Sequence, residues 1–132
     1  RNYRAMMFVL LTIAGGNILN RFVKNWVERP RPEVVDQLTS YSFPSGHAML
    51  GLLYLCTIAY LLSEILNSDK KVLLTWTFMI VLTVLVGLSR IAETHHYATD
   101  VLAGWFLGYS WFIICVYWYE GRTRKFKRFK KI

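Results

Sequence analysis

Two long runs without a charged residue constrain this chain more than any other feature of its sequence. One covers residues 72–89, which is 18 residues, and the other covers residues 101–119, which is 19 residues. At about 1.5 Å per residue, a helix over either run approaches the ~30 Å thickness of a bilayer's hydrocarbon core. The runs lack the alternating polarity of membrane barrel strands. The sequence therefore predicts an integral membrane protein built of helices.

Two further apolar segments complete the set of predicted spans. We expect helices over residues 5–23, 48–66, 72–91 and 99–119. The first two have uncharged centres of 16 residues each, which is short for a crossing, so their flanks must extend into the interface. No internal repeat or low-complexity linker separates the spans. We expect one all-α domain over residues 1–132, a polytopic transmembrane bundle.

The segments that connect the spans differ in length. Residues 67–71 form a short polar turn, whereas residues 24–44 form a long loop that contains Pro30 and Pro32. Proline excludes a regular helix there, and long loops in compact domains often carry function. Apolar side chains within residues 34–38 predict a short interfacial helix inside this loop.

Charged residues are unevenly divided between the two sides of the predicted bundle. The side with both chain ends and the short turn holds eleven basic and three acidic residues, and the other side holds five of each. The net charges are therefore +8 and zero. By the positive-inside rule the first side faces the cytoplasm. We expect both ends of this chain inside and the long loop outside.

The net charge of +8 could indicate a nucleic-acid-binding protein, but its distribution argues against one. Seven of the sixteen basic residues lie in residues 122–132, directly after the fourth span. A basic tail in that position typically rests on anionic lipid headgroups. The expected partner is the lipid bilayer, with no nucleic acid.

Some features inside the spans predict packing alone. Gly104 and Gly108 form a G-x-x-x-G pattern that permits close approach of another helix. Cys56 and Cys115 lie in apolar runs without metal-ligand spacing. We expect both cysteines to be small buried hydrophobes.

Ionisable and polar residues gather at the outer ends of the spans. They come from three separate stretches and include every histidine: Lys24, Arg31, Ser45, His47, Arg90, His95, His96 and Asp100. Charged residues at helix ends can be interfacial anchors, and this explanation suits Arg21, Arg29 and Glu120. Histidine is a poor anchor, so the set as a whole indicates a functional site.

His96 and Asp100 are spaced i, i+4 at the start of a predicted helix, which places them on one face. The carboxylate can accept a hydrogen bond from one ring nitrogen and leave the other nitrogen free to attack. His95 is one residue off that face. We expect it to lie at the surface or behind the site.

His47 follows Gly46 at the entry to the second span. Glycine lets the backbone approach a ligand closely, and N–H groups at a helix start form an anion site. Three cations, Lys24, Arg31 and Arg90, are expected around the same cavity. This combination suits phosphoryl transfer, in which one histidine attacks and the other protonates the leaving group.

These residues fall into a pattern of three parts. They read Lys24-x6-Arg31-Pro32, then Pro44-Ser45-Gly46-His47, then Ser89-Arg90-x5-His96-x3-Asp100. In order and internal spacing, the parts resemble the signature of the type 2 phosphatidic acid phosphatase superfamily. The resemblance covers most of the chain, and it selects Arg31 over Arg29 and His96 over His95.

The resemblance implies a role for each matched residue. His96 would form a phosphohistidine with Asp100 as its orienting partner, and His47 would be the acid and then the base. The phosphate would be bound by Lys24, Arg31, Ser45, Gly46 and Arg90, and the supporting residues would be Pro32, Pro44 and Ser89. The family needs no metal ion, and we expect no cofactor.

The resemblance also implies more structure and a class of substrate. Membrane members of the family typically have six spans, and the four spans here match the last four. We therefore expect that two upstream spans are missing, and the alternative is a minimal core of four spans. A lipid phosphate suits an outer-interface site flanked by spans. The best candidate is phosphatidylglycerol phosphate, and the alternatives are undecaprenyl diphosphate and phosphatidic acid.

Other functions remain open on the sequence. A vanadium haloperoxidase has similar motifs but is soluble, and an intramembrane serine protease using Ser45 would leave the three cations unexplained. A zinc site could use Glu93, His95, His96 and Asp100, although the nearby cations would repel the metal. The last alternative is a membrane scaffold that has the fold of the family but no catalytic activity.

The predicted sidedness can be tested by labelling in intact cells. A cysteine in place of Asp69 should resist an impermeant thiol reagent, because the short turn is expected inside. A cysteine in place of Asp36 should react, because the long loop is expected outside. The reverse pattern would overturn the assignment.

Overall fold

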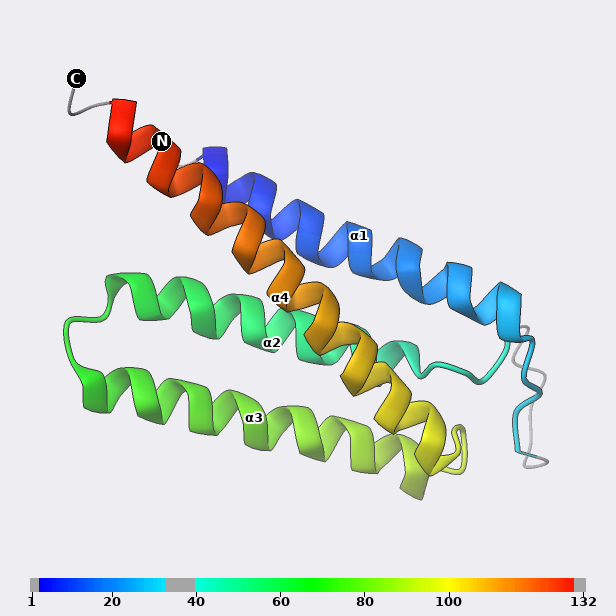
Figure 1. Ribbon diagram of the computed structural model, residues 1–132. Coiled ribbons are helices and arrows are strands. Elements are labelled where there is room, and N and C mark those ends of the chain that lie inside the picture. Colours follow the sequence, from blue (N-terminus) through cyan, green and yellow to red (C-terminus); the bar gives the residue numbers. More distant parts are fainter. Residues whose placement is uncertain (1–2, 33–39, 130–132) are drawn as a thin grey trace.

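A computed structural model describes residues 3–32 and 40–129, and side chains as far as residue 121. Its four helices are α1 (Tyr3–Val27), α2 (Gly46–Ile65), α3 (Asp69–Ala92) and α4 (Ala98–Phe129) (Figure 1). Each contains a segment long and apolar enough to cross a membrane. The predicted all-α bundle of four spans is therefore confirmed. The interfacial helix predicted within residues 34–38 lies outside the described residues.

The helices extend beyond the predicted spans because their ends have local support. α1 continues past residue 23 to Val27, with Lys24 in its last turn. α3 begins at Asp69, whose acidic side chain in the first turn interacts favourably with the positive end of the helix dipole. Ser45 caps the start of α2 by accepting a hydrogen bond from the N–H of Ala48 at 3.3 Å. The polar ends of the spans are thus helical as well.

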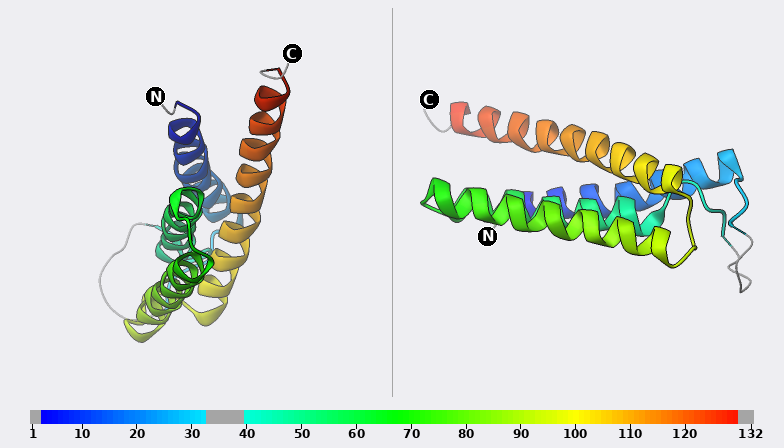
Figure 2. Two further views of the ribbon diagram at one scale, coloured as in Figure 1. Left: turned by 90° about the vertical axis from the view of Figure 1, so that its left-hand side faces the viewer. Right: turned by 90° about the horizontal axis from the view of Figure 1, so that it is seen from below.

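The α2 helix is at the centre of the bundle and contacts all three of the others. The turn between α2 and α3 lies at one end, together with both termini (Figures 1 and 2). The opposite end is formed by residues 28–32, 40–45 and 93–97, and we call it the loop end. The long loop and the α3–α4 connection therefore meet in space, as the alternating directions of the spans predict.

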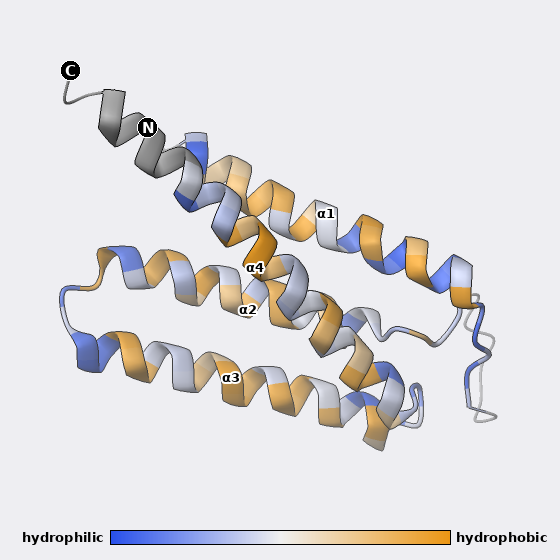
Figure 3. Ribbon diagram, in the orientation of Figure 1, coloured by the Kyte–Doolittle hydropathy of each residue, from blue (hydrophilic) through white to orange (hydrophobic). Residues whose placement is uncertain are grey.

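Apolar side chains lie both inside the bundle and on its outer surface. The core contains Phe8, Met49, Leu53, Phe112 and Cys115, all buried. The outward faces are also hydrophobic along the middle of the helices, and hydrophilic residues concentrate toward their ends (Figure 3). This distribution is expected of helices whose solvent is lipid. Cys56 and Cys115 are free and buried, as predicted.

The Gly104–Gly108 pattern serves helix packing, as predicted. A Cβ atom added at Gly104 would lie 2.9 Å from the carbonyl oxygen of Ser45, and one at Gly108 would lie 3.1 Å from that of Met49. These glycines allow α4 to approach the backbone of α2 at the loop end. A side chain there would push the two helix starts apart.

The Gly104→Ala variant should unfold at a lower temperature than the wild type, because its methyl group would meet a backbone atom that cannot turn away. Overpacking of this kind typically costs about 1–3 kcal/mol. Unfolding can be followed in detergent with a thiol-reactive dye that reaches the buried Cys56 and Cys115 only when the bundle opens. Gly121→Ala is the matched control, since no described atom lies within 4 Å of a Cβ there. Equal melting temperatures for the two variants would contradict the proposed packing role.

Candidate active site

The predicted site residues come together at the loop end. They are contributed by the last turn of α1, the start of α2, the last turn of α3 and the first turn of α4: Lys24, Ser45, Gly46, His47, Arg90 and Asp100. Arg31 and His96 belong to the two connections that meet there. Residues separated by up to 76 positions in sequence are thus assembled in one place (Figure 2).

His96 is buried in the α3–α4 connection, and both of its ring nitrogens have partners. Nδ1 lies 2.9 Å from the carbonyl oxygen of Ser42, and Nε2 lies 3.2 Å from Nη1 of Arg31. A carbonyl can only accept a hydrogen bond and a guanidinium can only donate one. These partners assign the ring proton to Nδ1, so Nε2 is unprotonated and its lone pair accepts from Arg31.

The surroundings keep this imidazole neutral. Burial lowers the pKa of His96, and the cation of Arg31 lowers it further, to about 4 from an ordinary value of 6.5. The hydrogen bond to the Ser42 carbonyl acts in the opposite direction but more weakly. A neutral imidazole with an unprotonated Nε2 is the form in which histidine can act as a nucleophile.

Asp100 lies beside His96 but does not make the hydrogen bond that the i, i+4 spacing predicts. Its Oδ2 is 3.6 Å from Nδ1 of His96, which is too long for a hydrogen bond. That oxygen accepts the backbone N–H of Tyr97 at 2.8 Å, because a carboxylate at this position caps the start of its own helix. The carboxylate is fully buried, and its negative charge remains next to the ring of His96.

Arg29 is not the interfacial anchor that the sequence suggests. Its Nη1 donates to Oδ1 of Asp100 at 3.0 Å and to the hydroxyl of Thr99 at 2.6 Å. Its guanidinium also lies 4.2 Å from the centre of the Tyr97 ring. The buried carboxylate requires a counter-ion, and Arg29 provides it.

Lys24 holds the start of α2 and keeps a donor available. Its Nζ donates to the carbonyl oxygen of Pro44 at 2.6 Å and to that of Tyr41 at 3.0 Å. An ammonium group has three donors, so one of the three can still serve a ligand. Lys24 therefore fits the predicted phosphate-binding role.

Arg31 joins the two connections of the loop end. Its Nε and Nη2 donate to the carbonyl and hydroxyl oxygens of Ser40, each at 2.9 Å, and Nη1 donates to the carbonyl of His95 at 3.0 Å. The same Nη1 faces Nε2 of His96. A phosphate oxygen that enters between these two groups would meet the cation and the nucleophile together.

Arg90 lies at the loop end but is paired with an acidic neighbour. Its Nη2 is 2.8 Å from Oε2 of Glu93, and the same oxygen is 3.2 Å from Nδ1 of His95. His95 is partly exposed and outside the His96 contacts, as predicted. Arg90 and Arg31 are both close enough to His47 to interact with it electrostatically.

A cavity of about 550 Å³ opens beside two of the predicted phosphate ligands, Lys24 and Gly46. Its lining includes Lys24, Ser40, Gly46 and the exposed side chain of His47. The lining also includes Asn20, a buried amide within the α1 span. His47 thus borders open space next to Lys24, where it can exchange a proton with a bound group.

Ser45 has a structural role in this arrangement, and the phosphate-binding role expected of it stays a prediction. Its side chain is fully buried and caps α2, and its N–H donates to the carbonyl oxygen of Asp100 at 3.0 Å. This geometry gives no support to a serine protease. Pro44 is also fully buried, and the hydroxyl of Ser89 donates to the carbonyl of Val86 at 2.7 Å, which fits their predicted supporting roles.

The residue types alone allow a zinc site, but the structure does not form one from Glu93, His95, His96 and Asp100. Glu93 and His95 pair with each other, whereas His96 lies beside Asp100 in the first turn of α4. Within residues 3–32 and 40–121, no group of three or more histidine, cysteine or acidic side chains is arranged to hold a metal ion.

Three contributors to the site were missed by reasoning from the sequence. Ser42 and Ser40 act mainly through backbone carbonyls, and any residue type has a carbonyl. Arg29 was detectable as a cation two residues before Arg31 in a proline-punctuated loop. Its pairing with Asp100, 71 residues away, leaves no local signal.

Comparison with known proteins gives consistent matches. The sequence profile of the PAP2 superfamily matches residues 5–124. Phosphatidylglycerophosphatase B of Bacillus subtilis is 35% identical over 130 residues, which are 95% of this chain and 61% of the relative. An undecaprenyl-diphosphatase of Sulfolobus acidocaldarius is 42% identical over 73 residues, which are 55% of this chain and 31% of the relative.

A solved structure matches as well. It is the crystal structure of a transmembrane PAP2 type phosphatidylglycerolphosphate phosphatase from Bacillus subtilis, and it superposes with a TM-score of 0.75 at 35% identity. The match covers 93% of this chain and 61% of that one, so the chain spans less than two thirds of these relatives. The profile covers nearly all of the four-helix bundle together with the three motif segments at its loop end, and the chain belongs to the PAP2 superfamily.

Proposed function

We propose that this chain carries the catalytic core of a metal-independent lipid phosphate phosphatase. One observation supports this most directly: the neutral His96 presents an unprotonated Nε2 to the cation of Arg31. A nucleophile next to a cation is what attack on an anionic phosphate requires. Lys24 and His47 border the adjacent cavity, where the rest of the substrate would lie.

In the first step, Nε2 of His96 attacks phosphorus and the bond from phosphorus to the leaving oxygen breaks. The leaving alkoxide takes a proton from protonated His47, which becomes neutral. The Nδ1 proton of His96 stays on the ring, so the phosphohistidine carries a positive imidazolium. The buried carboxylate of Asp100, 3.6 Å from Nδ1, stabilises that charge.

In the second step, water attacks the phosphohistidine. Neutral His47 accepts a proton from the water, the bond between phosphorus and nitrogen breaks, and inorganic phosphate leaves. Lys24, Arg31 and Arg90 neutralise the charge on the phosphate oxygens throughout, which is the work a metal ion does in other phosphatases.

The substrate is proposed to be a phosphomonoester or diphosphate of a membrane lipid. The site is at the end of apolar helices, where a lipid headgroup can enter while its chains stay in the bilayer. Phosphatidylglycerol phosphate is the first choice, in line with the name of the Bacillus subtilis relative. Undecaprenyl diphosphate and phosphatidic acid are the alternatives. A comparison of kcat/KM for the three lipids distinguishes them, and no phosphate release from any of them would reject the proposal.

The site is proposed to face the extracytoplasmic side of a cell membrane. The charge difference of +8 against zero between the two sides supports this orientation through the positive-inside rule. Because both connections of the loop end lie on the neutral side, a substrate in the outer leaflet would reach His47 directly.

Substitution of the two histidines should affect the reaction differently. His96→Ala should abolish the covalent intermediate, whereas His47→Ala should slow its formation and its hydrolysis by roughly 10²–10⁴-fold. A substrate with a good leaving group should recover much of the first step in His47→Ala. The measurement is a rapid quench with labelled lipid phosphate in the presence of EDTA, scoring acid-labile, base-stable label on the protein. Normal labelling of His96→Ala would exclude His96 as the nucleophile.

The protonation of His96 should not follow that of an ordinary histidine. Because the folded pKa is about 4 and the ordinary value is 6.5, the unfolded chain binds a proton between these pH values that the folded chain excludes. The stability contributed by neutral His96 is therefore present above pH 6.5 and is lost as the pH falls toward 4. Nitrogen-15 spectra of histidine-labelled protein in detergent should show a titration midpoint well below 6.5 for His96. A midpoint at 6.5 or above would contradict the burial argument.

Gly46 should matter for binding and not for folding. A methyl group there would meet only Oδ1 of Asn20, at an ordinary 3.6 Å, but it would project at the wall of the cavity. Gly46→Ala should raise KM by about tenfold, a loss of ~1.4 kcal/mol, while its melting temperature stays equal to that of the wild type or rises. Gly121→Ala should leave KM unchanged. An unchanged KM in Gly46→Ala would remove Gly46 from the phosphate site.

A further inference from the structure

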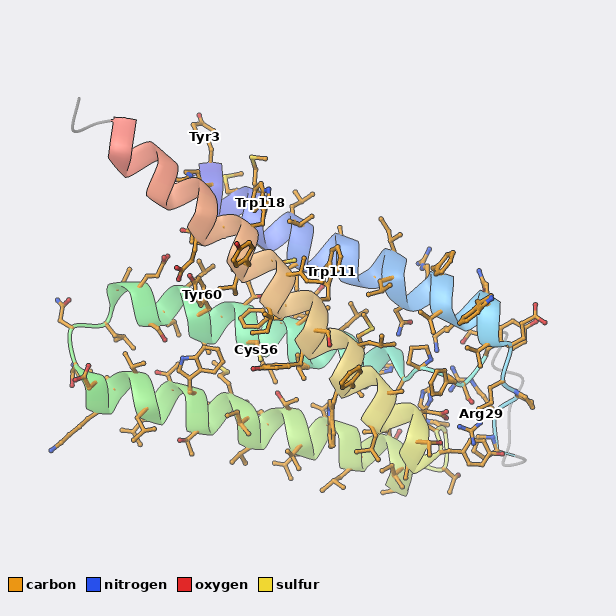
Figure 4. All side chains as sticks on the ribbon, viewed as in Figure 1. Tyr3, Arg29, Cys56, Tyr60, Trp111 and Trp118 are labelled. Atoms are coloured by element: carbon orange, nitrogen blue, oxygen red, sulfur yellow. The ribbon has the colours of Figure 1, made fainter. Side chains whose placement is uncertain are left out.

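Arg29 makes side-chain contacts to one small region, the first turn of α4. Its Nη1 donates to both Thr99 and Asp100, and its guanidinium stacks on Tyr97. Figure 4 shows Arg29 beside this turn at the loop end of the bundle. These side-chain contacts all direct the charge of Arg29 at the start of α4.

The backbone around Arg29 reaches His96 by a second route. The carbonyl oxygen of Arg29 accepts the N–H of Ser42 at 2.9 Å, and that of Pro30 accepts the hydroxyl of Ser42 at 3.2 Å. The carbonyl of Ser42 in turn accepts the Nδ1 proton of His96. Both partners of the Nδ1 side of the ring, Ser42 and Asp100, are thus held by Arg29 and its neighbour.

The two partners are held at different distances from Nδ1. The Ser42 oxygen is at 2.9 Å and Oδ2 of Asp100 is at 3.6 Å. A carboxylate is the stronger acceptor, and without another cation it would be drawn toward the ring proton. The ion pair with Arg29 compensates its charge from the opposite oxygen, Oδ1. The Tyr97 N–H on Oδ2 and the Arg29 contact on Oδ1 together hold the carboxylate, and the ring proton is left to a neutral carbonyl.

We propose that Arg29 is a positioning residue for the nucleophile: it keeps the carboxylate of Asp100 displaced from His96 in the free protein. When attack on phosphorus makes the imidazole ring positive, the nearby carboxylate can stabilise that charge. This role rests on the proposed phosphatase mechanism and adds to it a residue at one of the unspecified positions of the first motif part. Arg29 does not touch the phosphate.

A double-mutant cycle tests whether Arg29 acts through Asp100. Arg29→Gln should lower kcat by roughly 10- to 100-fold, the range for partners that orient a site residue, with KM within about threefold of wild type. Asp100→Asn should also lower kcat, and the double variant should be no slower than Asp100→Asn alone, because the two changes remove one shared interaction. Arg29→Lys keeps the charge and should recover part of the rate. Additive losses, or a rise in KM without a fall in kcat, would overturn the proposal.

A spectroscopic measurement gives a result that does not depend on activity. In Arg29→Gln the Nδ1 proton of His96 should move downfield in the proton spectrum, since the freed carboxylate of Asp100 can form a shorter, charge-assisted hydrogen bond. Arg29→Lys should show a smaller shift, and it also serves if Arg29→Gln does not fold. Melting temperatures identify loss of the folded state. An unchanged Nδ1 resonance in both variants would overturn the role of Arg29, whereas absence of phosphatase activity in the wild type would reject only the proposed function.

Discussion

The buried Asp100 is the interaction on which the candidate active site depends. Its backbone carbonyl accepts the N–H of Ser45, and its two carboxylate oxygens accept from Arg29 and from the N–H of Tyr97. One residue therefore connects the long loop, the start of α2 and the start of α4. Because the carboxylate is fully buried, each of these contacts also satisfies a group that would be costly to leave unpaired.

Close helix packing makes that connection possible. Gly104 lies one turn after Asp100 and brings α4 against the carbonyl of Ser45, so the N–H of Ser45 can reach α4. A transmembrane bundle lacks a hydrophobic driving force between helices and relies on such contacts of small residues. The same glycine that stabilises the bundle thereby sets the distance between the segment that holds His47 and the segment that holds His96.

The fold and the site residues differ in how far the sequence predicts them. Apolar run length and motif spacing are local properties, so the four spans and the gathering of Lys24, His47 and His96 at one end could be predicted. The proton partner of His96 could not, because i, i+4 spacing suggests Asp100 while the helix start needs that carboxylate for the N–H of Tyr97. The sequence also could not predict that Arg90 pairs with Glu93, since nearby acidic residues and a phosphate compete for the same cation.

The carbonyl of Ser42 has a consequence for how this protein tolerates change. A main-chain oxygen survives every side-chain replacement, so Ser42→Ala would keep the atom that holds His96 even as it loses the bond to Pro30. In a saturation mutagenesis screen, position 42 should accept small residues and reject large ones, and so would be read as a packing position. Side-chain substitutions would thus not detect the role of the Ser42 carbonyl oxygen in orienting the nucleophile. Only a change that moves the backbone of the loop would affect it.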